Sequence, residues 1–255
     1  DSINNVPSGG IIDTLKALSL ITVAGHIEDN SGNQSNDFNG VVAPVVFGKP
    51  SEIQTLANDG GLKMEFEEQN NILFSGKTRA KNGRFRFTFI VPRDIDYLPG
   101  KGKISYYAND EARDMNGSFS GIVTGGFSNK NDLDTEGPVI SLFINDTLFR
   151  SGGITDSNPR LLALIEDIGG INTAGTGIGH DLSCWLDNDH TAPFILNNYF
   201  ENDFGSYSRG SLIYNFSGLD PGSHTITLKA WDNFNNSSEK SLVFVVEKGE
   251  KFILK

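Results

Sequence analysis

The chain has 255 residues, which is enough for two domains of ordinary size. It contains 18 phenylalanines and 29 glycines but only two methionines, a composition that favours strands and tight turns over helices. The net charge of −11 opposes binding to nucleic acid through bulk attraction, and no apolar run approaches the length of a membrane span. We therefore expect no nucleic-acid partner and no transmembrane segment.

Short apolar or alternating stretches, separated by Gly, Asn, Asp and Pro, indicate strands along the whole chain. The first set is LSLITVAGHI, GVVAPVVF, LKMEFEE, RFRFTFIV and KISYYA, and the second is VISLFI, RLLALIE, LSCWL, SLIYNF, HTITLKAW and SLVFVV. The polar segment 128–138 between the two sets has the composition of a linker. We predict an all-β chain of two tandem immunoglobulin-like antiparallel β-sandwich domains, residues 1–133 and 138–248. Residues 249–255 would begin a following segment.

One basic stretch, GKTRAKNGRFRFTF, lies in the first predicted domain. Its Asn-Gly pair at 82–83 is a strong signal for a two-residue hairpin turn. The turn would pair Lys81 with Arg84 and Arg79 with Arg86 on the outer face, while the phenylalanines face the core. The resulting candidate docking patch consists of Lys77, Arg79, Lys81, Arg84 and Arg86.

Like charges that face one another on a sheet are destabilising, so this basic face needs a neutralising neighbour. An internal neighbour would be the strand LKMEFEEQ, with Met64 and Phe66 inward and Glu65 and Glu67 outward, beside the arginines. An external neighbour would be the phosphates or carboxylates of a docked partner. The internal source is the simpler interpretation, because exposed strand charges usually form a solvated face.

Two stretches of the sequence echo each other. GKISYYANDEARDMNGS and GSHTITLKAWDNFNNSS each run through a strand to Ala-x-Asp and then to a turn, which aligns Asp110 with Asp232. We predict that each stretch is the last hairpin of its sandwich. The simpler role of both aspartates is to accept hydrogen bonds from the backbone of the turn, and the alternative is a role as metal ligands.

The linker sequence DLDTEG offers Asp132, Asp134 and Glu136 at the spacing of a calcium loop. Pro138 follows directly, however, and Phe143 stands where the bidentate glutamate is required, so the segment is not an EF-hand. Acidic linkers between sandwich domains can still bind calcium with carboxylates from both sides. The three carboxylates are therefore a candidate calcium site, with ordinary solvated linker charges as the simpler interpretation and no other cofactor expected.

The segment GTGIGHDLSCW places His180 four residues before Cys184, the two residue types of a cysteine-peptidase dyad. The preceding glycines disfavour a helix, and the alternation that follows indicates a strand, on which these positions lie roughly 13 Å apart. They cannot be catalytic partners, and Cys184 is expected to be a small buried hydrophobe. The glycine-rich loop 169–181 lacks the lysine and the strand–loop–helix setting of a phosphate site. The residues thus support no catalytic centre.

Residues 134–188 (DTEGPVISLFINDTLFRSGGITDSNPRLLALIEDIGGINTAGTGIGHDLSCWLDN) and 207–238 resemble the region after the catalytic domain of PorU-type sortases of the type IX secretion system. FNGVVAPVVFGKP, NGRFRFTFIVPRDIDYLPGKGKISYYA and VTGG resemble the segment just before that region. These sortases are gingipain-like cysteine peptidases, and their active-site histidine and cysteine lie in an upstream domain that has no match here. The resemblance implies a location on the extracellular face of the bacterial outer membrane, with a signal peptide outside this chain. It also implies a parent protein that removes the sorting domain of secreted cargo and links the cargo to anionic lipopolysaccharide.

On this resemblance the chain would form non-catalytic C-terminal accessory domains and would not itself be an enzyme. The implied partners are its own upstream catalytic domain, other type IX secretion components at the surface, and anionic lipopolysaccharide. The alternative function is an extracellular adhesion or carbohydrate-binding module, which requires a solvent-facing aromatic platform. The candidates for such a platform are Tyr97, Tyr199, Phe200 and Tyr207.

Overall fold

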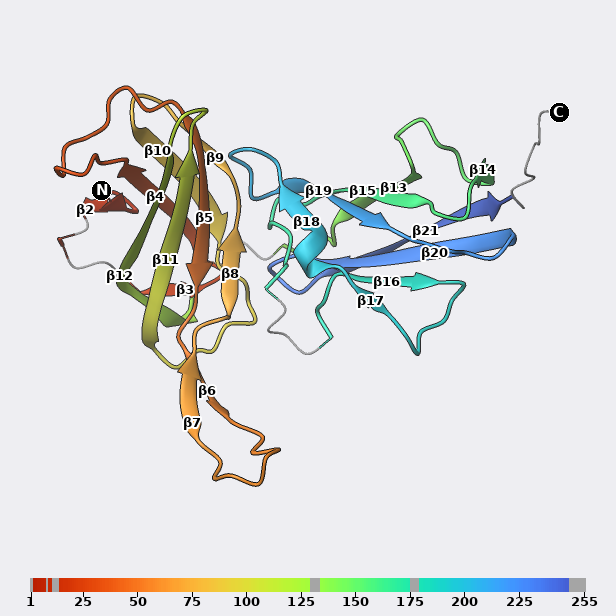
Figure 1. Ribbon diagram of the computed structural model, residues 1–255, viewed down its shortest axis with the longest axis horizontal. Coiled ribbons are helices and arrows are strands. Elements are labelled where there is room, and N and C mark those ends of the chain that lie inside the picture. Colours follow the sequence, from red (N-terminus) through yellow and green to blue (C-terminus); the bar gives the residue numbers. More distant parts are fainter. Residues whose placement is uncertain (1, 8, 11–13, 129–133, 175–178, 248–255) are drawn as a thin grey trace. The chain divides into compact units, whose positions relative to one another are not determined.

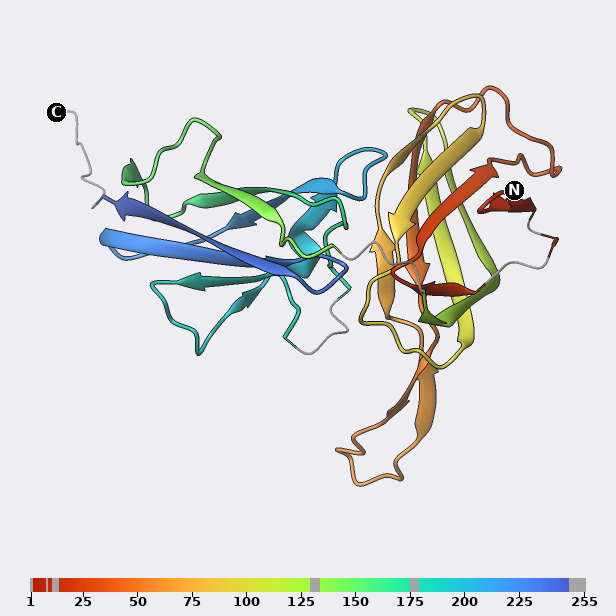
Figure 2. The same ribbon diagram turned by 180° about the vertical axis from the view of Figure 1, so that it is seen from behind.

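A computed structural model describes residues 2–7, 9–10, 14–128, 134–174 and 179–247 (Figures 1 and 2). The chain divides into two compact units. The first unit is Asp1–Leu133 with Ala174–Ile178 and Asn202–Tyr207, and the second is Asp134–Thr173 with Gly179–Glu201 and Ser208–Lys255. Strands and turns account for the described residues apart from one short 3₁₀ helix, η1 (Asn197–Tyr199). The prediction of an all-β chain built from antiparallel sandwiches is confirmed.

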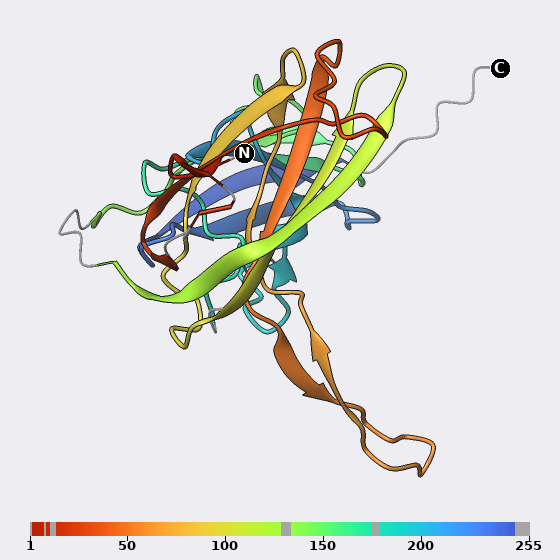
Figure 3. The ribbon, with the colours of Figure 1, turned by 90° about the vertical axis from the view of Figure 1, so that its left-hand side faces the viewer.

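The first unit is a sandwich of two sheets with an added hairpin. Its described strands are β1 (Ser2–Ile3), β2 (Val6–Pro7), β3 (Leu15–Ala17), β4 (Leu20–His26), β5 (Gly40–Phe47), β6 (Ser51–Gln54), β7 (Glu65–Glu68), β8 (Ile72–Ser75), β9 (Thr78–Ala80), β10 (Arg84–Ile90), β11 (Gly100–Asn109) and β12 (Asp114–Phe127). One sheet has the order β10-β4-β1-β2, and the other has the order β3-β12-β11-β5-β8 with β9 also paired to β5. The hairpin β6–β7 projects away from both sheets (Figure 3).

The core of the first unit is rich in aromatic rings. Along β10 the arginines are exposed and the phenylalanines are buried, as the alternation in the sequence predicts. Phe89 is fully buried and stacks on Phe74, with 4.9 Å between the ring centroids. Phe85 packs against Tyr106 with 5.5 Å between the centroids. These rings join the apolar residues of β4, β5, β11 and β12 in one continuous core.

The predicted turn at 82–83 is present, because Asn82 and Gly83 both have positive φ (50° and 72°) and Lys81 bridges to Arg84. The predicted pairing of Arg79 with Arg86 beyond the turn is wrong. Strand β9 pairs with β5, which places Arg79 opposite Val41, whereas β10 pairs with β4 in the other sheet. A sandwich needs strands in both of its sheets, and here β9 joins one sheet while β10, on the other side of the turn, joins the second sheet. The predicted basic residues therefore do not form one two-stranded ladder.

The predicted neutralising strand is also in a different place. Strand β7 pairs with β6, where Glu67 stands opposite Glu52, and it is not a neighbour of β9 or β10. Met64 and Phe66, which the sequence placed inward, are 68% and 47% exposed. The alternation correctly indicated a strand but does not specify its partner, and the projecting hairpin has no second sheet to cover its apolar side.

The second unit is also a two-sheet sandwich. Its described strands are β13 (Val139–Ile144), β14 (Gly153–Thr155), β15 (Arg160–Glu166), β16 (Ser183–Leu186), β17 (Phe194–Ile195), β18 (Phe200–Asn202), β19 (Arg209–Asn215), β20 (Gly222–Trp231) and β21 (Ser237–Val246). The sheets have the orders β13-β15-β19-β18 and β14-β21-β20-β16-β17. Most pairs are antiparallel, but β14 runs parallel to β21, as β3 does to β12 in the first unit.

The two sheets of the second unit enclose a core of aliphatic side chains together with Cys184, Phe216 and Phe244. In both units the last two strands form an antiparallel hairpin, β11–β12 and β20–β21. Asp110 directly follows β11, and Asp232 directly follows β20. The two stretches that echo each other in the sequence are therefore equivalent hairpins, as predicted.

Candidate functional site

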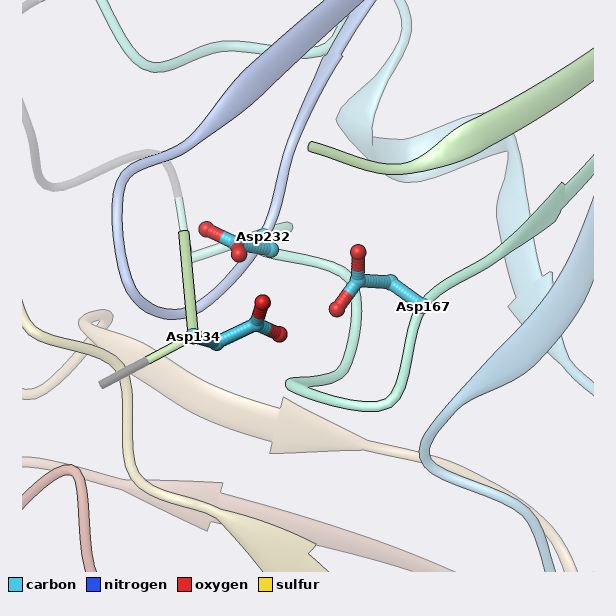
Figure 4. Close-up of side chains that lie close together, drawn as sticks. All are labelled: Asp134, Asp167 and Asp232. Carbon is cyan, nitrogen blue, oxygen red and sulfur yellow. The ribbon is translucent and has the colours of Figure 1, made fainter. Parts of the chain in front are cut away.

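Three aspartates of the second unit lie together at one end of its sandwich (Figure 4). Asp134 precedes β13, Asp167 follows β15, and Asp232 follows β20. Strands β13 and β15 are antiparallel, so the start of β13 lies beside the end of β15. A β-bridge between Ile171 and Asp232 joins the loop after β15 to the end of β20 in the other sheet. Each residue offers one carboxylate oxygen to the cluster, and these three oxygens lie within 4.8 Å of one another.

Asp232 is held in place by the turn that follows it. The residue is 0% exposed, and its Oδ1 accepts hydrogen bonds from the backbone N–H groups of Phe234 (2.9 Å) and Asn236 (2.7 Å). Oδ2 accepts a further bond of 2.8 Å from Nδ2 of Asn236. Burial raises the pKa of this carboxyl despite these bonds, and the charge of Asp134 adds to the rise. The predicted role of Asp232, to bond the backbone of its turn, is confirmed.

Asp167 is partly buried and begins a tight loop. Its Oδ1 accepts a hydrogen bond of 2.6 Å from the N–H of Gly169, and Gly170 adopts a positive φ of 81°. Burial is the main cause that raises the pKa of Asp167 to about 7, and the nearby carboxylates Asp232 and Asp134 raise it further. A carboxyl of this kind changes its charge near neutral pH.

Asp134 contributes an oxygen to which no described residue donates a hydrogen bond. Its Oδ1 accepts a bond of 3.1 Å from the N–H of Glu136, while Oδ2 is buried and has no partner in the described part of the chain. Nδ2 of Asn236 donates to the main-chain oxygen of Asp134 at 2.9 Å and so fixes this segment next to Asp232. A Cβ atom at Gly169 would lie 3.0 Å from Oδ2 of Asp134 and 3.0 Å from Oδ1 of Asp167. These two carboxylate oxygens therefore face the same small space, which a larger residue at 169 would reduce.

The equivalent aspartate of the first unit has a different environment. Oδ1 of Asp110 accepts bonds from the N–H groups of Ala112 (3.0 Å) and Arg113 (2.8 Å), so its predicted role in the turn is confirmed as well. Its Oδ2 forms an ion pair of 2.7 Å with the guanidinium of Arg113, which lowers the pKa of the carboxyl. In the second unit no described Lys, Arg or His lies beside Asp232 in the way that Arg113 lies beside Asp110. The neighbours of Asp232 are instead the carboxylates of Asp134 and Asp167.

Of the linker carboxylates predicted as a calcium site, the structure brings only Asp134 to this cluster. Asp132 lies outside the described residues, and Glu136 is exposed. Asp167 was not identified from the sequence. Its signal was weak: an acidic residue at the end of a buried strand, followed by Ile168 and then by two glycines.

Cys184 lies on β16 and is 0% exposed, and burial raises the pKa of its thiol to about 12. The ring of His180 packs against Trp231, with 4.3 Å between the centroids.

Arg79, one of the predicted docking cations, lies over the ring of Phe204, 5.3 Å from its centroid. No helix in the described part of the chain is long and apolar enough to cross a membrane.

The four aromatic residues considered as a carbohydrate platform are divided between the two units. Tyr207 packs against the core of the first unit, and Phe200 packs against the core of the second. Tyr97 and Tyr199 are each 48% exposed, the former in contact with Phe127 and the latter with Tyr214.

No protein-family model and no curated protein matches the chain. Among solved structures it is similar to dimeric latent PorU from Porphyromonas gingivalis, with 30% sequence identity and a TM-score of 0.58 over 98% of this chain. The chain resembles a region of PorU. It spans only 24% of the length of that protein. The resemblance to PorU-type sortases that the sequence indicated is supported to this extent.

Two other solved structures are less similar. The fibronectin(III)-like modules of CbhA from Clostridium thermocellum match at 11% identity and a TM-score of 0.26, over 96% of this chain and 93% of theirs. Red sea bream transglutaminase matches at 8% identity and a TM-score of 0.27, over 97% of this chain and 31% of its own. At these TM-scores neither likeness carries an argument about function.

Proposed function

We propose that this chain forms non-catalytic accessory sandwiches of a cell-surface peptidase or sortase of the type IX secretion system. The observation that carries the proposal is the similarity to PorU, which extends over 98% of the chain at 30% identity. The match covers only 24% of PorU, and our proposal assigns catalysis to another part of the parent protein. The sandwiches support that domain and dock its partners on the extracellular face of the outer membrane.

The environment of the only cysteine supports a non-catalytic role. A cysteine nucleophile requires an accessible thiolate. The Cys184 thiol is fully buried, and its pKa of about 12 keeps it protonated at neutral pH. Its neighbours across the sheet are Leu228 and Phe194, which are apolar and provide no base.

The proposal is tested in the parent protein by comparing Cys184→Ala with removal of residues 134–247. We expect the Cys184→Ala protein to process cargo at the wild-type rate, and we expect the truncated protein to lose processing or to be degraded. The purified 255-residue chain should cleave no peptide by itself. Peptide cleavage by this chain that disappears on Cys184→Ala would overturn the assignment.

Docking of anionic lipopolysaccharide or of other secretion components is tested on the exposed face of β10. Arg84 and Arg86 are both exposed there, so a double reversal to Glu changes the charge of this face without altering the core. A reversal of Lys63 and Lys101, which are exposed elsewhere in the same unit, is the matched control. Loss of lipopolysaccharide binding or of pull-down only in the arginine variant supports docking through β10, whereas equal binding by both variants refutes it.

A further inference from the structure

We propose that Asp134, Asp167 and Asp232 form a binding site for one calcium ion at the end of the second sandwich (Figure 4). The site goes beyond the accessory role proposed above and does not depend on it. It also differs from the linker site suggested by the sequence, because two of its three ligands come from the sandwich itself.

The first argument is the unbalanced charge. Three carboxylates, each with one oxygen within 4.8 Å of an oxygen of the other two, repel one another in a partly buried place, and no described basic side chain neutralises them. The equivalent Asp110 shows how the same turn is balanced in the first unit, where Arg113 supplies the positive charge. A cation bound among the aspartates would supply a positive charge that no described side chain supplies.

The second argument is independent of charge and concerns one buried atom. Oδ2 of Asp134 has an accessible area below 1 Å² and no hydrogen-bond partner among the described residues. Buried polar atoms in native proteins almost always have a partner, so such an oxygen requires an explanation. It faces the same space at Gly169 as Oδ1 of Asp167. An ion bound between the carboxylates of Asp134 and Asp167 would coordinate both residues and satisfy the unpartnered oxygen.

The geometry and the ligand type favour calcium. Calcium binds oxygen ligands at about 2.3–2.6 Å, so ligands on opposite sides of the ion are about 4.6–5.2 Å apart. The limit of 4.8 Å between one oxygen of each aspartate is therefore compatible with a single ion that contacts all three residues. Zinc prefers nitrogen and sulfur ligands, and magnesium requires a tighter octahedral arrangement with shorter bonds. Water and main-chain oxygens would complete the coordination of calcium.

The surrounding structure holds the ligands in place. Asn236 donates both to the main-chain oxygen of Asp134 and to Oδ2 of Asp232, so it links two of the ligand segments. Nδ2 of Asn233 donates to the main-chain oxygen of Gly169 at 2.9 Å and so connects the loop of Asp167 to the same turn. A bound ion would fasten the segment that leads into β13 onto the end of the sandwich.

The test uses the purified 255-residue chain at pH 7.5, with isothermal titration of CaCl₂ and thermal unfolding in CaCl₂ or in EDTA. We expect a Kd for calcium below about 1 mM, as in extracellular calcium modules, and a Tm several degrees higher with calcium than with EDTA. Asp167→Asn should lose both effects and still fold, because its Tm in EDTA should equal or exceed that of the wild type. The matched control is Asp110→Asn, which should keep the calcium-dependent rise in Tm even though its own stability is lower.

The absence of calcium binding by the wild-type chain up to 10 mM, on the order of ten times the weakest Kd expected, would overturn the proposal. A rise in Tm that persists in Asp167→Asn, or an equal rise with MgCl₂, would also overturn it, because either result indicates a general ionic effect. If Asp167→Asn does not fold, Asp134→Asn replaces it, since Asp134 lies on the segment before β13 and contributes no strand pairing.

Discussion

Replacement of Asp167 by Asn should stabilise the calcium-free second sandwich at alkaline pH but not at acidic pH. Burial and two neighbouring carboxylates raise the pKa of Asp167 from 3.8 to about 7 in the folded chain. The folded state therefore binds this proton more tightly than the unfolded state does. Between these two pKa values the folded state holds more protons, so the free energy of unfolding falls as the pH rises. Above pH 7 the destabilisation is complete, and below pH 4 it is absent.

The expected magnitude follows from the same shift. A rise of about three pKa units corresponds to about 4 kcal/mol. Because Asp167 is only partly buried and solvent screens its charge, we take about half of this value, ~2 kcal/mol. Asn is uncharged at every pH and avoids the penalty. The stability of the variant relative to the wild type should therefore grow by about 2 kcal/mol between pH 4.5 and pH 8.

The assay is urea denaturation followed by tryptophan fluorescence, in EDTA, at both pH values. The chain has two tryptophans, Trp185 and Trp231, and both belong to the second unit, so the signal reports that sandwich alone. Titrating groups outside the aspartate cluster are common to both proteins and cancel in the difference, whereas Asp134 and Asp232 lose the repulsion of Asp167 in the variant, which adds to the expected effect. A stability difference that is the same at both pH values, or a variant that is less stable than the wild type at pH 8, would refute the reasoning.

Three further outcomes are expected. Phe89→Ala should lower the stability of the first unit by about 3 to 5 kcal/mol in calorimetry, because the ring is fully buried against Phe74. A smaller loss would mean that the core collapses around the cavity. Cys184 should react with a thiol reagent only after unfolding, and rapid reaction of the native chain would contradict its burial. Replacing the hairpin tip 56–63 by a short turn should change stability by less than about 0.5 kcal/mol, because Leu56 and Leu62 are 78% and 91% exposed. A larger loss measured by calorimetry would show that the tip contributes to the core.

The features that sequence reasoning predicted correctly are local. The alternation in RFRFTFI determines which side chains of β10 are buried, and the requirement for positive φ identifies the turn at 82–83. The echo between Asp110 and Asp232 identified equivalent hairpins, because both turns use an aspartate to bond their own backbone.

The features that it missed depend on which strands become neighbours. The alternation around Phe66 is that of a buried strand, yet β7 projects with β6 and has no sheet above it. Asp134, Asp167 and Asp232 are far apart in the sequence and meet only because β13 pairs with β15 and the two sheets then pack together. No spacing rule along the chain describes such a site, since its geometry is set by sheet packing.

The strand arrangement of the second unit has a mechanical consequence. The chain enters this unit at Asp134, beside the end of β20, and leaves after β21, whose last residue Val246 stands opposite Gly222 at the start of β20. The entry and the exit therefore lie at opposite ends of the strands. The short strand β14 runs parallel to β21, and the N–H of Glu247 extends the pairing with a bond of 3.1 Å to the carbonyl of Thr155. Tension applied between Asp134 and Val246 would load β21 in shear against its neighbours β14 and β20. Their hydrogen bonds would then bear the load together and would not break one at a time.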